Sequence, residues 1–170
     1  MSAVCQVADA TTGVVYVYAS PVEVCPHLDW VLAASLGCRA KVRWSPQPMA
    51  DGNMRATINW TGPVGTGSRL ASALAAWPQV RFEVTEDPSE GVDGERFCHT
   101  PDLGLWRGTM SANGDTVIPE MRLKALIAAR SNDLAEALHT ELGTSWDDEL
   151  EPFRAASDGA EVTWVTRRVG

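Results

Sequence analysis

Apolar and polar residues alternate with clear periods in the first half of the chain, beginning with a strand and a helix. Residues 14–18 (VVYVY) are β-branched and aromatic, which is typical of a strand. Ser20 and Glu23 have the spacing of a capping box, while Pro26 favours a regular helix only from that residue onward. Leucines then recur at helical spacing until Gly37, which can end the helix.

Two alternating strands, a second helix and a further strand follow in the same half. Residues 39–44 place basic side chains on one face and apolar ones on the other, and residues 54–60 repeat this alternation. A glycine-rich bend at residues 62–67 leads into a helix that Pro78 ends, and residues 80–85 alternate again. This order of elements is the split-βαβ pattern of ferredoxin-like folds, whose helices cover one face of the sheet.

The second half is less regular and extends the first. Its predicted elements are strands over 96–100 and 105–110, a hairpin turn at Asn113-Gly114 with a return strand over 116–118, a helix entered at Pro119, a helix over 133–142 closed by Gly143, and a strand over 162–165. The fold class expected is therefore α+β. It combines a ferredoxin-like βαββαβ half (14–86) with a C-terminal extension (87–170) of a β-hairpin, two helices and a final strand.

One domain over residues 14–170 accommodates all of these elements, and residues 1–13 are expected to form a flexible tail. The start of the chain lacks the charged and apolar regions of a signal peptide, and no apolar run is long enough to span a membrane. The sequence therefore predicts a cytoplasmic protein.

Charge is divided unevenly along the chain, which carries a net charge of −8. Residues 1–85 contain 6 basic and 5 acidic residues, whereas residues 86–170 contain 8 basic and 17 acidic residues. An isoelectric point near 4.8 argues against nucleic-acid binding over the whole surface but leaves room for a local basic patch.

The sheet face opposite the predicted helices is the first candidate binding surface. It is expected to carry Tyr16, Tyr18, Arg39, Lys41, Arg43, Arg55, Thr57, Asn59 and Arg81. Basic residues beside aromatics resemble the base-binding sheets of RNA-recognition domains, although the aromatic signature of those domains is absent. A protein partner, or the acidic half of the same chain, could equally cover this face.

A weaker candidate for anion binding is the glycine-rich start of the second helix. Its residues are Gly65, Thr66, Gly67, Ser68 and Arg69. Backbone amides at a helix start can hold a phosphate, as in coenzyme A or a phosphorylated metabolite. No lysine follows, so this is not a P-loop, and a tight turn with helix capping explains the same glycines.

Two further groups of residues could carry chemistry. Cys25, His27, Cys98 and His99 could form a zinc site or a thiol nucleophile with its base, or each could be structural. The cysteine spacings match no metal knuckle, so neither a metal nor another cofactor is predicted. Asp147, Asp148, Glu149 and Glu151 could bind a cation or complement a helix dipole, and the flanking Trp146 and Phe153 could anchor a protein partner.

Seven segments, in chain order, resemble an actinobacterial family, domain of unknown function 3145. They are CPHLDWVLAASLG, WSPQP, GTGSRLASAL, RFEVTEDPSEG, HTPDLG, ANGD and WDDELEPFR. The resemblance supplies no catalytic motif. It implies a bacterial cytoplasmic protein of a family encoded near fatty-acid synthesis genes, with an acyl-carrier protein or acyl-CoA carboxylase subunit as partner. We therefore expect a non-enzymatic accessory or regulatory subunit; the alternatives are a small enzyme using Cys25, His27 and His99, and a sensor of coenzyme A.

Overall fold

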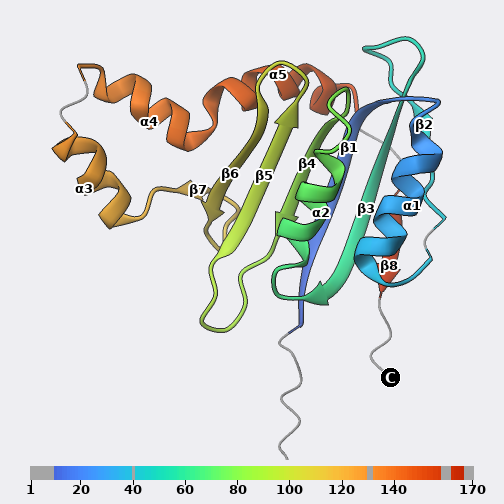
Figure 1. Cartoon of the computed structure of the whole chain (residues 1–170), viewed down its shortest axis with the longest axis horizontal. Coiled ribbons are helices and arrows are strands. Elements are labelled where there is room, and N and C mark those ends of the chain that lie inside the picture. The colour runs from blue at the N-terminus through green and yellow to red at the C-terminus, as the bar shows by residue number, and fades with distance from the viewer. Residues whose placement is uncertain (1–9, 40, 130–131, 158–161, 167–170) are drawn as a thin grey trace, which may run out of the picture.

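The computed structural model describes residues 10–39, 41–129, 132–157 and 162–166, which form a mixed α+β fold (Figure 1). One eight-stranded sheet contains β1 (Ala10–Pro21), β2 (Ser45–Pro46), β3 (Asn53–Pro63), β4 (Arg81–Glu86), β5 (Gly94–Thr100), β6 (Gly104–Met110), β7 (Thr116–Val117) and β8 (Val162–Thr166). The helices are α1 (Cys25–Leu36), α2 (Thr66–Leu74), α3 (Glu120–Ala128), α4 (Leu134–Leu142) and α5 (Thr144–Ala155). The α+β class expected from the sequence is confirmed.

The first strand and helix form where the sequence predicts them, with different boundaries. Residues 10–13, assigned to the tail, already belong to β1, and residues 1–9 lie outside the described residues. A proline in the first turn starts α1, and Gly37 ends it in the left-handed conformation with φ 68°. The predicted capping box is wrong: Val24 is the N-cap, and the Ser20 hydroxyl donates to the carbonyl of Pro21 instead.

The strands are ordered β2-β3-β1-β4-β5-β6-β7, and β8 pairs with β3 beside β2. Every neighbouring pair is antiparallel except β3 with β8. Tyr16 at the centre of the sheet lies opposite Thr57 of β3 on one side and Glu83 of β4 on the other. This register places the three side chains on the same face of the sheet.

The predicted strand over residues 39–44 is wrong for its described residues, because in this part of the chain only Ser45–Pro46 pairs with β3. Extended backwards, the β2 register would place Arg43 opposite Thr57, but Thr57 pairs with Val162 of β8 instead. Residues 41–44 therefore run beside β8, where the amide of Arg43 donates to Oγ1 of Thr163 at 3.1 Å. A strand that comes much later in the chain has taken the place on β3.

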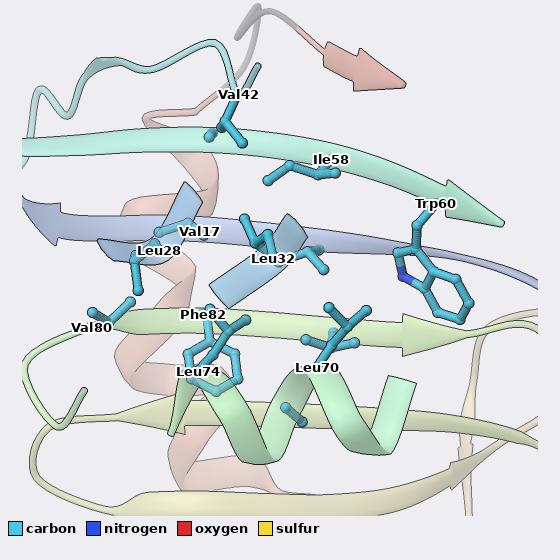
Figure 2. Close-up of a cluster of buried hydrophobic side chains, with 14 of the residues drawn as sticks. Val17, Leu28, Leu32, Val42, Ile58, Trp60, Leu70, Leu74, Val80 and Phe82 are labelled. Atoms are coloured by element: carbon cyan, nitrogen blue, oxygen red, sulfur yellow. The ribbon is translucent and has the colours of Figure 1, made fainter. Parts of the chain in front are cut away.

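The main core lies between the sheet and the pair of helices α1 and α2. Figure 2 shows Leu28 and Leu32 of α1 and Leu70 and Leu74 of α2 in front of the strands, among side chains of the same buried cluster. Phe82 is fully buried there. Burial of these apolar side chains is the main source of stability for this half.

The C-terminal half contains a third helix, α5, in addition to the two expected from the sequence. α5 crosses the strands on the face opposite the main core (Figure 2). Its Leu150 is buried in a second cluster with Tyr18, Cys98 and Trp106. α3 and α4 lie beyond β6 and β7 and away from α1 and α2 (Figure 1). None of the helices in the described part of the chain is both long and apolar enough to cross a lipid bilayer.

Candidate functional site

An open cleft of about 580 Å³ lies on the sheet face that α5 partly covers. Strands β1, β3, β4 and β5 form its floor, the end of α5 forms one wall, and the β6–β7 hairpin forms the other. The described residues that line it are Tyr16, Tyr18, Thr57, Glu83, Thr85, Arg96, Met110, Gly114, Arg154 and Ser157. This volume falls within the range of small-molecule sites.

Glu83 is the centre of a charged cluster in this cleft, and only 9% of its side chain is exposed. One of its oxygens accepts from Nε of Arg96 at 2.7 Å, and the other accepts from Nη2 of Arg154 at 2.7 Å. The hydroxyl of Tyr18 also donates to Glu83, at 3.0 Å. A buried carboxylate is stable only with partners of this kind.

Asp147 of α5 completes the cluster by bridging the two arginines. Its Oδ1 lies 2.5 Å from Nη2 of Arg96 and 2.8 Å from Nη2 of Arg154. Burial opposes ionisation of Asp147, but the hydrogen bonds and charges of both arginines outweigh it and lower the pKa of this carboxyl. Residues of two strands and one helix are thus tied together by alternating charges.

Two tyrosines form the aromatic part of the floor. The rings of Tyr16 and Tyr18 are nearly parallel, with an interplanar angle of 4° and centroids 5.8 Å apart. Burial and the nearby carboxylate of Glu83 raise the pKa of both phenols, so both are neutral at physiological pH. The cleft therefore combines an aromatic floor with a charged end.

The structure brings together only some of the residues predicted for the sheet face. Tyr16, Tyr18 and Thr57 line the cleft. Arg81 lies over the ring of Phe153 at 4.7 Å, and Arg55 donates to the carbonyl of Ala156, so both hold the end of α5. The covering of this face by the acidic half, considered as an alternative from the sequence, is thus observed in part.

The remaining predicted residues of that face lie elsewhere. Asn59 lines a separate hollow of about 240 Å³ beside Trp164 of β8. Arg39, Lys41 and Arg43 are exposed in the segment before β2, which is not a strand. The basic stripe expected from the sequence is therefore not continuous.

The aromatic and acidic segment of α5 contributes to the site through only one of its carboxylates. Trp146 donates to the carbonyl of Gly104 at 2.9 Å and packs beside the ring of Trp106. Asp147 joins the charged cluster, whereas Asp148 is exposed and Glu149 is half-buried. No group of three or more possible metal ligands occurs among the described residues.

Glu83, Arg96 and Arg154 were not predicted as site residues. A signal for Glu83 was present, since it alternates with Arg81 and Thr85 in a strand that the sequence does predict. Arg96 and Arg154 gave no such signal, because their positions depend on the pairing of β5 with β4 and on the docking of an unpredicted helix.

The predicted anion site at the start of α2 already holds a carboxylate of the same chain. The amides of Gly65 and Gly67 donate to the two oxygens of the buried Glu86, at 2.9 and 2.7 Å. The Arg69 side chain donates to Oγ1 of Thr66, and Ser68 is half-buried. A phosphate could bind these amides only by displacing Glu86.

The cysteine and histidine residues have separate surroundings. The thiol of Cys25 lies near the hydroxyl of Ser20, and the ring of His27 stacks on Trp77. Cys98 and His99 are consecutive in β5 and point to opposite faces, where Nδ1 of His99 lies 2.7 Å from the carbonyl of Val80. Burial, the largest effect, raises the pKa of Cys98 to about 12, which keeps the thiol protonated.

Comparison with known proteins places the chain in one family. Residues 14–167 match the family described as "Protein of unknown function (DUF3145)", which covers nearly all of the described structure. No curated protein and no solved structure matches the chain. The resemblance noted from seven sequence segments is thereby confirmed, and the chain belongs to the DUF3145 family.

Proposed function

We propose that this chain is a protein-binding accessory or regulatory subunit that docks through helices α3 and α4, together called the arm. The observation that carries this proposal is that neither helix has a buried residue. Met121 is 74% exposed and Ile127 is 56% exposed, and Leu134 is exposed as well. Single exposed apolar residues are ordinary, but two successive helices without a buried side chain are not.

Within the arm, Nε of Arg122 on α3 donates to Glu141 on α4 at 2.9 Å. The described side-chain hydrogen bonds that join the arm to the rest of the chain come from α4: the indole of Trp106 donates to the carbonyl of Thr140 at 3.1 Å, and Nδ1 of His139 lies 3.0 Å from Oγ1 of Thr144 on α5. Helices of this length gain most of their stability from packing of an apolar face. A partner that covers the arm would supply that packing.

The partner proposed is a protein that offers an amphipathic helical surface. The arginine and lysine of α3 are paired within the arm, as Arg122 with Glu141 and Lys124 with Glu120. Apolar contact rather than charge is therefore the expected source of affinity, as in helix-in-groove recognition. The family resemblance makes the cytoplasmic fatty-acid synthesis machinery, an acyl-CoA carboxylase subunit or an acyl-carrier protein, the partner to test.

The same proposal includes a ferredoxin-like classification for residues 14–86. Within this half the strands are ordered β2-β3-β1-β4, all pairs are antiparallel, and α1 and α2 cover one face. These features support the classification. A scaffold of this kind leaves its second face for the C-terminal half and for a ligand.

Two alternatives have less support. An enzyme using Cys25 would need a reactive thiolate, yet burial and, to a smaller degree, the charges of Asp29 and Glu23 raise the pKa of this thiol. A coenzyme A sensor using the start of α2 would need Glu86 to leave the amides of Gly65 and Gly67.

The test compares three forms of the full chain as bait in native lysate: wild type, the arm variant Met121→Ser/Ile127→Ser, and the control Trp30→Ser. Trp30 is 75% exposed on α1, so the control removes an equally accessible apolar side chain outside the arm. Both variants should keep the wild-type unfolding free energy within about 0.5 kcal/mol.

We expect one protein in near-stoichiometric amount with the wild type and the control, and its loss with the arm variant. The complex should survive 0.5 M salt, because exposed charges are screened at that concentration whereas apolar contacts are not. Binding of the purified partner is then measured directly. Recovery of the bait alone, or equal capture by the arm variant, would refute the proposal.

A further inference from the structure

Trp164 of β8 projects from the sheet on the face opposite the main core. Its neighbour Val165 belongs to the core cluster, and successive residues of a strand point to opposite faces. Trp164 is 77% exposed, whereas Val165 is buried. Attachment of β8 to the sheet therefore does not require the indole ring. A single exposed apolar side chain is ordinary, so the surroundings of the ring decide whether it has a role.

The hollow of about 240 Å³ beside Trp164 has a floor of short side chains. The register places Trp164 next to Asn59 of β3 and Asn59 opposite Val14 of β1. Two residues further along β3, Thr61 lies opposite Thr12 of β1. Residues two apart in a strand share a face, so all of these side chains lie on the face of the indole.

Asp87, which follows β4, lines the other side of the hollow and is fixed in place although it is exposed. Its amide donates to the carbonyl of Thr12 at 2.8 Å, and its own carbonyl accepts from the hydroxyl of Thr11 at 2.8 Å. Its Oδ2 accepts from the hydroxyl of Thr12 at 2.6 Å, whereas no described residue donates to Oδ1. One oxygen of a well-positioned carboxylate is therefore available as an acceptor.

Two neutral polar groups of the hollow are available as well. The side-chain amide of Asn59 and the hydroxyl of Thr61 are half-buried, and neither makes a hydrogen bond to another described residue. Each group can both donate and accept. No cationic residue is among the described residues that line the hollow, so an anionic ligand would face Asp87 without a compensating charge. A neutral ligand with several hydroxyl groups matches this lining.

The size of the hollow suits one sugar ring. Its volume is below the roughly 300–1,000 Å³ that is usual for sites of drug-sized ligands. Trp164 and Asp87 belong to strands that are three spacings apart, which is about 14 Å, and the indole fills part of this span. A pyranose with equatorial hydroxyls has an apolar C–H face that can pack on an indole and a rim of donors and acceptors.

We propose that this hollow binds a neutral pyranose sugar with equatorial hydroxyls. The C–H face of the sugar lies on the indole of Trp164, and one rim hydroxyl donates to Oδ1 of Asp87. Other hydroxyls form hydrogen bonds with the Asn59 amide and the Thr61 hydroxyl. The hollow shares no residue with the arm, so sugar binding and partner docking can be tested separately.

The test uses methyl β-D-glucopyranoside as probe, because its hydroxyls are all equatorial. Binding to the full chain is followed by protein-observed NMR. We expect a dissociation constant on the order of 1–10 mM, with the largest shifts at the indole N–H of Trp164 and the side-chain amide of Asn59. Tetrahydropyran, a similar ring without hydroxyls, and adenine, a flat heteroaromatic ring, should each bind at least about tenfold more weakly.

Variants with an intact fold provide the second part of the test. Trp164→Ala should weaken binding of the glucoside at least about tenfold, because the apolar face of the site is lost. Trp30→Ala is the matched control, since Trp30 is 75% exposed on α1 and should leave binding unchanged. Asn59→Leu keeps the size of the side chain but removes its amide, and should weaken binding about fivefold. The arm variant Met121→Ser/Ile127→Ser should bind the glucoside as the wild type does.

Three results would overturn the proposal. The first is the absence of saturable shifts up to about 50 mM glucoside, well above the expected dissociation constant. The second is binding of tetrahydropyran or adenine as tight as that of the glucoside, which would make the hollow a site for apolar or flat aromatic rings. The third is unchanged affinity of Trp164→Ala for the glucoside when circular dichroism shows an intact fold.

Discussion

Arg154 on α5 and Glu83 on β4 form an ion pair across the sheet face, with Nη2 and Oε2 2.7 Å apart. The pair joins the acidic C-terminal half to the half that carries the main core. Arg154 also donates through Nε to the hydroxyl of Tyr18 at 3.2 Å, so one side chain connects α5 with two neighbouring strands. The position of α5 depends on this contact as well as on apolar packing.

Removal of the charge at Glu83 should destabilise the chain strongly. Glu83→Gln leaves Arg96 and Arg154 without their shared buried carboxylate, and we expect a loss of about 3 kcal/mol in the free energy of unfolding. Urea denaturation measures it. The control is Glu151→Gln, because Glu151 is exposed and contacts Arg154 only at 3.5 Å. That change should cost less than about 0.5 kcal/mol, and equal costs for the two variants would contradict the role given to the cluster.

The stability of the chain should depend on Asp147 at acidic pH. Its pKa is lowered from the ordinary value of 3.8 by Arg96 and Arg154 against the opposing effect of burial. A lowered folded-state pKa gives stability that is complete above the ordinary value and is lost as the pH falls towards the lowered value. Urea unfolding between pH 5 and pH 2.5 should therefore show a steeper decline for the wild type than for Asp147→Asn.

The exposed neighbour Asp148 supplies the control for this experiment. Asp148→Asn should decline as steeply as the wild type, because its carboxylate is accessible to water. If the unfolding free energy of Asp147→Asn declined with falling pH as steeply as that of the wild type, the two arginines would not hold this carboxylate in solution.

Thiol labelling should separate the described cysteines by burial. Cys98, with a pKa raised to about 12 from 9.0, should react with iodoacetamide at pH 8 about a thousandfold more slowly than an ordinary thiol. The raised pKa of Cys25 should also slow its reaction, whereas the half-buried Cys38 should label first. Peptide mapping by mass spectrometry identifies each site, and unfolding in urea should abolish the differences. Fast labelling of Cys25 would revive the enzyme alternative.

Replacement of Glu86 should open the anion site at the start of α2. Glu86→Ala leaves the amides of Gly65 and Gly67 without their carboxylate, and we expect a loss of about 2 kcal/mol of unfolding free energy. Inorganic phosphate at 20 mM should then raise the melting temperature of the variant more than that of the wild type. Equal responses of the two proteins would show that these amides do not take up a free anion.

Elements with local end signals were predictable from the sequence. The helix expected over residues 133–142 exists because Asp133 accepts a hydrogen bond from the amide of Glu136 at 2.9 Å and Gly143 adopts φ 71° at its end. The hairpin turn at Asn113-Gly114 formed for the same reason, with Gly114 at φ 87°. Such signals lie within a few residues of the element that they define.

Elements whose position depends on residues far away in the chain were not predictable from the sequence. The segment over 39–44 alternates well but loses its place on β3 to β8, more than a hundred residues later in the chain. For α5, Trp146, Leu150 and Phe153 have helical spacing, but Pro152 inside the helix and the run of carboxylates obscured it. The alternation of residues in the first strand was enough to predict that the tyrosines lie on the cleft face. The positions of the arginines in the cleft could be learned only from the tertiary structure.

The parallel pairing of β8 with β3 has a consequence for synthesis of the protein. Residues 14–86 can begin to collapse on the ribosome as soon as they leave the exit tunnel, since their strands and helices are close in sequence. The edge of β3 from Thr57 to Thr61 stays open at that stage, because its neighbour is Val162–Thr166. The nascent chain therefore exposes an unpaired strand edge until residues 162–166 emerge, a period in which chaperone binding or aggregation competes with completion of the sheet.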